Sequence, residues 1–240
     1  MADMNGLALV TGAGRGLGAG IARHLAATGW AVAVNDLAGT HTVVGEILRA
    51  GGRAITVEGD VTDEDQVRAM VAQIGPVDLL VVNATGPQPV IGVEDLTWRH
   101  HLDQLEFFVK SPTLLVNAVL PGMRAAGRGR IVHIGSDMVD RALPGWSAYA
   151  AAKSALHTLT RCWARELGPH GITVNTVAPG WIPVERHDGE PTDDYLADVP
   201  LGRLGTPHDV AATVAYLASD AAAFVTGQCL RVNGGHSEAL

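Results

Sequence analysis

The residues best suited to chemistry are a tyrosine and a lysine four positions apart, Tyr149 and Lys153. The chain has three tyrosines and two lysines in all. Both residues fall in 148–167, where the apolar spacing predicts a helix, and positions i and i+4 share one helical face. Because an ammonium favours the phenolate form of a nearby tyrosine, Tyr149 is a candidate general acid/base near neutral pH.

A serine hydroxyl comes thirteen residues before the tyrosine. Ser136 closes a predicted strand at 130–134, and the carboxyl end of a parallel strand faces the crevice where α/β proteins bind ligands. An alternative interpretation gives the three residues ordinary roles. Tyr149 would then be a core aromatic, Lys153 a solvated charge and Ser136 a cap of a helix or turn.

A glycine-rich turn follows the first predicted strand. Residues 11–18 read TGAGRGLG, which differs in spacing from the common G-x-G-x-x-G. Glycines let the backbone approach a pyrophosphate, which a helix N-terminus stabilises. Asp36 ends the second strand twenty residues after Gly16, where a carboxylate can bind an adenosine ribose. Strand, turn, helix and acid together predict dinucleotide binding; a structural turn and a helix cap are the alternatives.

The elements that position these residues alternate between apolar strands and amphipathic helices. Strands are predicted at 7–10, 31–35, 54–58, 79–83, 130–134, 173–178 and 228–232, and helices at 18–28, 63–74, 97–126, 148–167 and 208–217. Strands such as 79–82, Leu-Leu-Val-Val, are apolar throughout, which is typical of a parallel sheet covered on both faces. We predict an α/β fold: one doubly wound Rossmann-type domain, 1–240, with a seven-stranded parallel sheet.

The longest irregular stretch, 179–206, is rich in proline, glycine and acidic residues. Loops of this length are usually functional, so we expect a substrate loop, with a variable surface loop as the alternative. Trp146, Trp181 and His187 are candidates to line a substrate pocket, or to pack in the core or a lid.

Composition limits the function further. The 240 residues carry a formal charge of −8 and no basic run, which argues against a nucleic-acid partner. No segment approaches the ~20 apolar residues of a membrane span, and the first residues do not resemble a signal peptide. Cys162 and Cys229 are expected to be buried free thiols in a reducing, cytoplasmic compartment. The ten histidines show no metal-ligand spacing, so no metal site is predicted.

These motifs jointly resemble the short-chain dehydrogenase/reductase family, nearest its 3-oxoacyl-carrier-protein reductase-like members, from about Leu7 to Gly235. The matching segments are 11–18, Asp60-Val61, Asn83-Ala84, Ser136, Tyr149 with Lys153, Asn175, 179–182 and 232–235. The resemblance implies an NAD(P)-dependent oxidoreductase that interconverts a carbonyl and a secondary alcohol by hydride transfer. Tyr149 would exchange the proton, Ser136 would bind the oxygen, and Lys153 would bind the nicotinamide ribose and tune Tyr149.

The cofactor contacts implied by the resemblance are Gly12, Arg15, Gly16, Leu17, Gly18, Asp36, Asp60, Val61, Asn83, Ala84, Tyr149, Lys153, Pro179, Gly180 and Ile182. Asp36 favours NAD because it would repel a 2′-phosphate, whereas Arg15 could pair with that phosphate and favour NADP. The resemblance also implies a homotetramer and a small-molecule substrate, which could be a 3-oxoacyl or polyketide-like compound.

The chain departs from the family pattern in three places. Thr85 adds a side chain after Asn83-Ala84, and Val184 stands where a hydroxyl residue often lies near the diphosphate. Phe108 or Leu105, depending on the direction of counting, occupies the position of a relay asparagine, which implies about three extra residues in this helix segment. Gln104 and Asn117 are possible substitutes. A second hypothesis follows: a cofactor-binding protein with reduced or no turnover, acting as a sensor or scaffold.

Overall fold

The computed structural model describes residues 6–185 and 192–236, which contain one parallel sheet of seven strands. Its strand order is β3-β2-β1-β4-β5-β6-β7. The strands are β1 Leu7–Val10, β2 Ala31–Asp36, β3 Arg53–Glu58, β4 Leu79–Val82, β5 Gly129–Ile134, β6 Ile172–Pro179 and β7 Cys229–Val232. The sheet confirms the predicted fold class.

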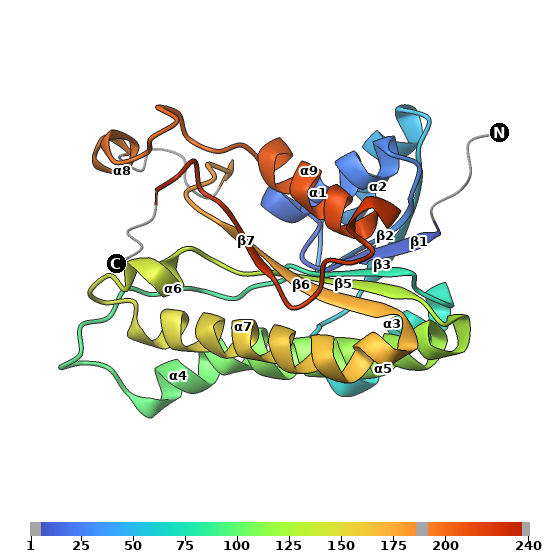
Figure 1. Ribbon diagram of the computed structural model, residues 1–240, viewed down its shortest axis with the longest axis horizontal. Helices are drawn as coiled ribbons and strands as arrows, with labels where there is room; N and C mark the ends of the chain where they lie inside the picture. Colours follow the sequence, from blue (N-terminus) through green and yellow to red (C-terminus); the bar gives the residue numbers. More distant parts are fainter. Residues whose placement is uncertain (1–5, 186–191, 237–240) are drawn as a thin grey trace.

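Helices cover both faces of the sheet (Figure 1). One face carries α1 Gly16–Ala27, α2 Thr40–Arg49 and α9 Pro207–Ala218, and the other carries α3 Glu64–Ile74, α5 Ser111–Ala126 and α7 Ser147–Leu167. Each face has its own core of buried aliphatic side chains. Inner strands are buried on both sides, as in β4, which explains why their sequences are apolar throughout.

The direction of strand succession reverses between β1 and β4, which are hydrogen-bonded neighbours. In doubly wound sheets, ligands bind outside the carboxyl ends of the strands at such a reversal. The glycine-rich turn after β1 and Asn83 after β4 meet here, because the Asn83 backbone N–H donates to Thr11 Oγ1 at 3.0 Å.

The helix predicted at 97–126 is interrupted in the structure. It consists of α4 Trp98–Leu105, a π-helical turn Glu106–Lys110 and α5. A π-helical turn inserts a residue into an otherwise regular helix and so shifts the faces of the two flanking segments. One inserted residue accounts for only part of the predicted excess of about three residues around Phe108. Within the described residues, three α-helices were not predicted: α2, α6 Met138–Arg141 and α8 Asp193–Ala197.

The two cysteines are free, as predicted, but the expectation that they are buried is wrong. Cys162 is exposed on α7, and Cys229 is exposed on β7. β7 is the last strand of the sheet, so its residues alternate between exposed and half-buried positions instead of being covered on both faces. Within 6–185 and 192–236, no helix is long and apolar enough to cross a membrane.

Candidate active site

Tyr149 and Lys153 lie in the first two turns of α7, and the lysine is buried against the sheet. Lys153 is 5% exposed, and its Nζ donates to the carbonyl oxygen of Ile134 at 2.7 Å. The same Nζ lies 5.7 Å from the centroid of the Tyr149 ring. Lys153 is therefore not a solvated charge. Its ammonium is fixed between the tyrosine and the carboxyl end of β5.

The Tyr149 ring is held edge-to-face between two other aromatic rings. Its centroid lies 5.4 Å from that of Phe108 and 5.6 Å from that of Trp146, at interplanar angles of 88° and 72°. Aromatic rings favour such T-shaped contacts because the positive edge of one meets the negative face of the other. The packing leaves Tyr149 half-buried with a defined orientation.

Ser136 lies two residues after the end of β5 and is buried, at 8% exposure. Its Oγ accepts a hydrogen bond at 3.2 Å from the backbone N–H of Met138, the first residue of α6. The Ile134 carbonyl that accepts the hydrogen bond from Lys153 lies two residues before this serine in the sequence. The structure thus brings the start of α7 to the strand end that carries Ser136.

The glycine turn is packed closely enough to require its glycines. Gly12 and Gly16 have φ of +63° and +58°, values that side-chain-bearing residues rarely adopt. A Cβ on Gly18 would overlap the Gly12 carbonyl oxygen and lie 2.6 Å from Asn83 Nδ2. That Nδ2 donates to the carbonyls of Thr11 and Gly12, both at 3.0 Å. Asn83 therefore holds the turn in shape.

Asp36 is hydrogen-bonded to the same turn. One carboxylate oxygen accepts from the Gly14 N–H at 3.0 Å and the other from the Leu37 N–H at 2.8 Å. The carboxylate is thereby oriented at the carboxyl end of β2, next to the glycine turn. Arg15 is exposed at the N-terminus of α1.

Asp60 serves the turn after β3. Its Oδ1 accepts from both the backbone N–H and the hydroxyl of Thr62, at 2.8 and 2.7 Å. Val61 is buried beside it, and Ala84 donates its N–H to Thr11 Oγ1 at 3.2 Å. Asp60 therefore holds the turn after β3, and the hydrogen bond to Thr11 brings Ala84 to the glycine turn.

A cavity of ≈ 360 Å³ opens at the N-terminus of α1. Its lining residues are Gly16, Gly20, Arg23, Pro183, Val184, Glu185 and Pro207. A Cβ on Gly16 would come no closer than 3.7 Å to the carboxylate of Glu185 or the side chain of Val184, so space remains beside the helix N-terminus. A helix N-terminus stabilises a phosphate group through free N–H groups and its dipole. Leu17 packs against the adjacent core.

The segment after β6 is held by a tyrosine that the sequence did not single out. The hydroxyl oxygen of Tyr195, in α8, accepts from the Trp181 N–H at 2.9 Å, and a Cβ on Gly180 would overlap that hydroxyl. Gly180 itself donates to the Val232 carbonyl at 3.0 Å. Ile182 is buried at 6% exposure. His187 lies outside the described residues.

A second missed group is Asp137, next to Ser136. Its side chain is 2% exposed, and burial raises the pKa of the carboxyl to about 6. Electrostatic interactions with Arg141 and His236 oppose this rise in pKa. His236 stacks on the Tyr195 ring at 4.2 Å, and the Arg141 guanidinium lies 5.1 Å from that ring. No sequence motif indicated this cluster.

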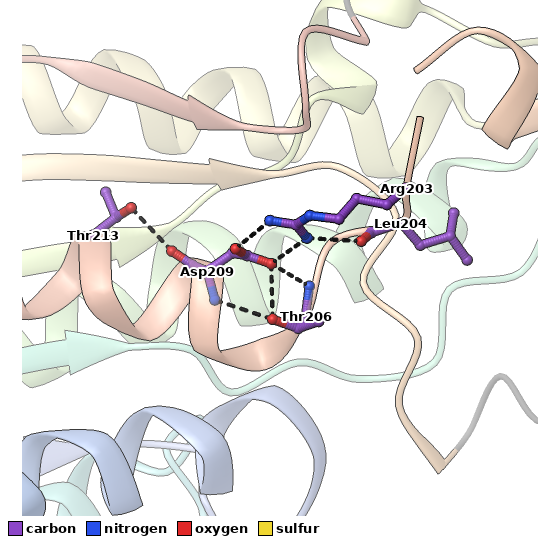
Figure 2. A network of polar contacts seen from close by, with 5 residues as sticks. All are labelled: Arg203, Leu204, Thr206, Asp209 and Thr213. Carbon is purple, nitrogen blue, oxygen red and sulfur yellow. Dashed lines mark hydrogen bonds and ion pairs between the residues drawn. The ribbon is translucent and has the colours of Figure 1, made fainter. Parts of the chain in front are cut away.

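The loop returns to the sheet through a polar network at the start of α9 (Figure 2). Arg203 forms two hydrogen bonds of 2.8 Å with the carboxylate of Asp209. The same carboxylate accepts from the Thr206 N–H and hydroxyl, and Thr206 Oγ1 caps the helix by accepting from the Asp209 N–H. This capping box fixes the end of the 179–206 segment.

The structure distinguishes between the candidates for the relay position. Phe108 is buried and contacts Tyr149 and Lys153, whereas Asn117 is exposed on α5. Gln104 is buried, but its Nε2 donates to the Pro87 carbonyl at 2.9 Å. Within the described residues, no group of three or more His, Cys, Asp or Glu could hold a metal ion.

Comparison with known proteins agrees with this geometry. The family profile described as Enoyl-(Acyl carrier protein) reductase matches residues 12–237. Over 96% of both chains, the sequence is 40% identical to cis-4-hydroxycyclohexanecarboxylate dehydrogenase of Sinomonas cyclohexanicum. It is 39% identical to the 3-oxoacyl-acyl-carrier-protein reductase of Staphylococcus aureus, over 95% of this chain and 96% of that one.

The chain belongs to the short-chain dehydrogenase/reductase family. Among solved structures, a gluconate 5-dehydrogenase from Burkholderia cenocepacia in complex with NADP and tartrate superimposes with a TM-score of 0.91. The two are 32% identical, over 99% of this chain and 97% of that one. As a short-chain dehydrogenase/reductase, the protein is an NAD(P)-dependent oxidoreductase that acts on CH–OH groups.

The residues present fit that cofactor. The open space at Gly16 and the cavity beside α1 suit a pyrophosphate, and the oriented Asp36 carboxylate suits a ribose hydroxyl. Val184 lines the cavity, and its apolar side chain has no hydrogen-bonding group to offer a phosphate there.

Proposed function

We propose that the protein interconverts a carbonyl and a secondary alcohol with Tyr149 as general acid/base. Ser136 donates a hydrogen bond to the reacting oxygen, and Lys153 favours the phenolate of Tyr149 and binds the nicotinamide ribose. The observation that carries the proposal is the buried ammonium of Lys153, 5.7 Å from the Tyr149 ring and tied to β5. A positive charge at that place stabilises a tyrosinate, as proton transfer near neutral pH requires.

The bound nicotinamide supplies or accepts the hydride. We assign its binding to residues grouped around the carboxyl ends of β1, β2, β3, β4 and β6. They are Gly12, Arg15, Gly16, Leu17, Gly18, Asp36, Asp60, Val61, Asn83, Ala84, Pro179, Gly180 and Ile182. The described parts of the 179–206 segment, 179–185 and 192–206, are held through Tyr195 and the Arg203–Asp209 pair, and we assign the segment to substrate binding.

Asp36 supports a preference for NAD(H) over NADP(H). Its carboxylate is fixed beside the glycine turn, and exposed Leu37 follows it with no positive charge to balance a 2′-phosphate. We expect a higher kcat/KM with NADH than with NADPH. Asp36→Ser should lose roughly tenfold or more with NADH, the size of one charge-assisted hydrogen bond. Asp65→Ser, in the exposed first turn of α3, is the control. Equal or better efficiency with NADPH would contradict the preference, with Arg15 as its cause.

The substrate proposal is a 3-oxoacyl or polyketide-like carbonyl compound, supported by the reductase among the relatives. The Sinomonas relative is named for a hydroxycarboxylate instead, so small hydroxy acids belong in the same assay. We also propose a homotetramer located in the cytoplasm. Light scattering at micromolar concentration tests the tetramer, and a monomeric mass would contradict it.

One observation favours the second candidate, a cofactor-binding protein with little turnover. An apolar ring, Phe108, faces Lys153 at a position where the family resemblance implies a relay asparagine. A panel of carbonyls and alcohols with both nicotinamides separates the two. Turnover of any member supports the enzyme. A change in NADH or NADPH fluorescence on binding, with no turnover across the panel, supports the sensor or scaffold.

A further inference from the structure

The ammonium of Lys153 has an aromatic neighbour that the proposed mechanism does not use. Lys153 Nζ lies 3.9 Å from the centroid of the Phe108 ring, closer than the 5.7 Å to the Tyr149 ring. Phe108 is 2% exposed and Lys153 5% exposed. A cation over a ring face within about 6 Å is attracted by the quadrupole of the ring, and most strongly where water is excluded.

The π-helical turn Glu106–Lys110 is what places this ring. Such a turn adds one residue to the helix and changes which side chain faces a given neighbour. Here Phe108 faces α7, while Phe107 lies against Gly86 in the loop after β4. Thr113 Oγ1 donates a hydrogen bond at 2.7 Å to the carbonyl oxygen of Val109, a residue of the π-helical turn.

The same ring contacts both members of the catalytic pair. It lies over the Lys153 ammonium and forms a T-shaped contact with Tyr149 at 5.4 Å. The polar candidates nearby do not take this place, because Gln104 is bonded to the Pro87 carbonyl and Asn117 is exposed. Lys153 therefore lies between the Ile134 carbonyl and an aromatic ring.

We propose that Phe108 is a positioning residue: its ring binds the Lys153 ammonium and so keeps the charge beside Tyr149, in place of a polar side chain. The inference rests on the proposed function, because it takes Tyr149 and Lys153 as the residues that move the proton. If Phe108 only packed in the core, substitutions would rank in the opposite order of kcat, and this difference gives a direct test.

Three variants separate the two roles. Phe108→Tyr keeps a ring, Phe108→Leu keeps an apolar side chain without a ring, and Phe108→Asn restores a polar group. If the ring binds the ammonium, Phe108→Leu lowers kcat about 5- to 30-fold, and Phe108→Tyr stays near wild type. Phe108→Asn, despite a lower Tm, should lose less kcat than Phe108→Leu. If Phe108 only packs, Phe108→Leu is tolerated and Phe108→Asn is the damaging variant, which would overturn the proposal.

The pH profile of kcat adds a readout that packing does not move. In the alcohol-oxidising direction, kcat rises with pH as Tyr149 loses its proton. An ammonium that is held less firmly beside Tyr149 favours the phenolate less, so the rising limb of the profile should move to higher pH in Phe108→Leu only. The other titratable groups near Lys153 are His133 on β5 and His157 on α7. Burial and the lysine charge lower the pKa of both, so both are neutral above pH 7. Leu115→Ala, a buried substitution on α5, controls for lost stability and should leave the limb in place.

An activity-independent measurement keeps this inference separate from the proposed function. The chain has only two lysines, so ¹³C-lysine labelling gives two sets of Cε–Hε signals, which Lys110→Arg assigns. The Lys153 Hε signals should be shifted upfield by the ring in wild type and Phe108→Tyr, and should return toward the ordinary position in Phe108→Leu. Unshifted wild-type signals would overturn the proposal. If Tyr149→Phe proves fully active while the upfield shift is present, the proposed function fails and the contact stands.

Discussion

Replacing Asp137 by asparagine should stabilise the protein, although the residue lies beside Ser136. The Asp137 side chain is 2% exposed, and its Oδ2 has no hydrogen-bond partner within 6–185 and 192–236. Burial is the main cause that raises the pKa of the carboxyl to about 6 from its ordinary 3.8. Arg141, His236 and a hydrogen bond from Asn233 reduce the shift without cancelling it.

The magnitude follows from this difference in pKa between the unfolded and folded states. Between pH 3.8 and about 6, the folded protein holds a proton that the unfolded chain has lost, so the free energy of unfolding decreases as pH rises through this window. Above it the loss is complete and amounts to about 3 kcal/mol. An asparagine carries no charge at any pH. We therefore expect Asp137→Asn to gain about 2–3 kcal/mol relative to wild type at pH 7.5 and little at pH 4.

Urea denaturation of wild type and Asp137→Asn at a series of pH values measures this difference. Asp140→Asn, on the same short helix, is the matched control of opposite sign. A hydrogen bond from Arg231 lowers the pKa of Asp140, so its removal should destabilise the protein slightly at pH 7.5. A loss of stability in Asp137→Asn at pH 7.5, or a difference from wild type that does not change with pH, would refute the reasoning.

Two further predictions concern the glycine turn and the end of the 179–206 segment. Gly18→Ala should abolish cofactor binding, measured by NADH fluorescence titration, because the added Cβ overlaps the Gly12 carbonyl oxygen. Gly45→Ala, on α2, is the control, because its added Cβ meets nothing closer than 3.9 Å. This variant should bind NADH normally, and its free energy of unfolding should rise by about 0.5–1 kcal/mol. Thr206→Ala should lower the free energy of unfolding in urea by about 1 kcal/mol through the lost cap of α9. Arg203→Ala should lower it less, because the Arg203 side chain is exposed to solvent. Normal NADH binding by Gly18→Ala, or a larger loss in Arg203→Ala than in Thr206→Ala, would contradict these arguments.

Several elements could be predicted from the sequence because their signals are local. The buried strands read as continuous apolar runs, and each predicted strand end lies within one residue of the observed end. The spacing of Tyr149 and Lys153 placed both on one helical face, and the structure adds the bond to Ile134 that buries the lysine.

Other features depend on contacts between distant segments and could not be predicted. Apolar periodicity does not reveal the inserted residue of a π-helical turn, so the sequence predicts one continuous helix over 97–126. The roles of Asp137 and Tyr195 arise only when the segments after β5, β6 and β7 come together. The exposure of Cys229 follows from the edge position of β7, which an apolar run alone does not indicate.

The central claim is that Tyr149 moves the proton, and Tyr149→Phe tests it most directly. The phenylalanine ring keeps the contacts with Phe108 and Trp146 but removes the hydroxyl. On a substrate that the wild type turns over, kcat should decrease about 10²–10⁴-fold, while the Kd for NADH, measured by fluorescence, should change little. Wild-type kcat in Tyr149→Phe, with cofactor binding intact, would contradict the account.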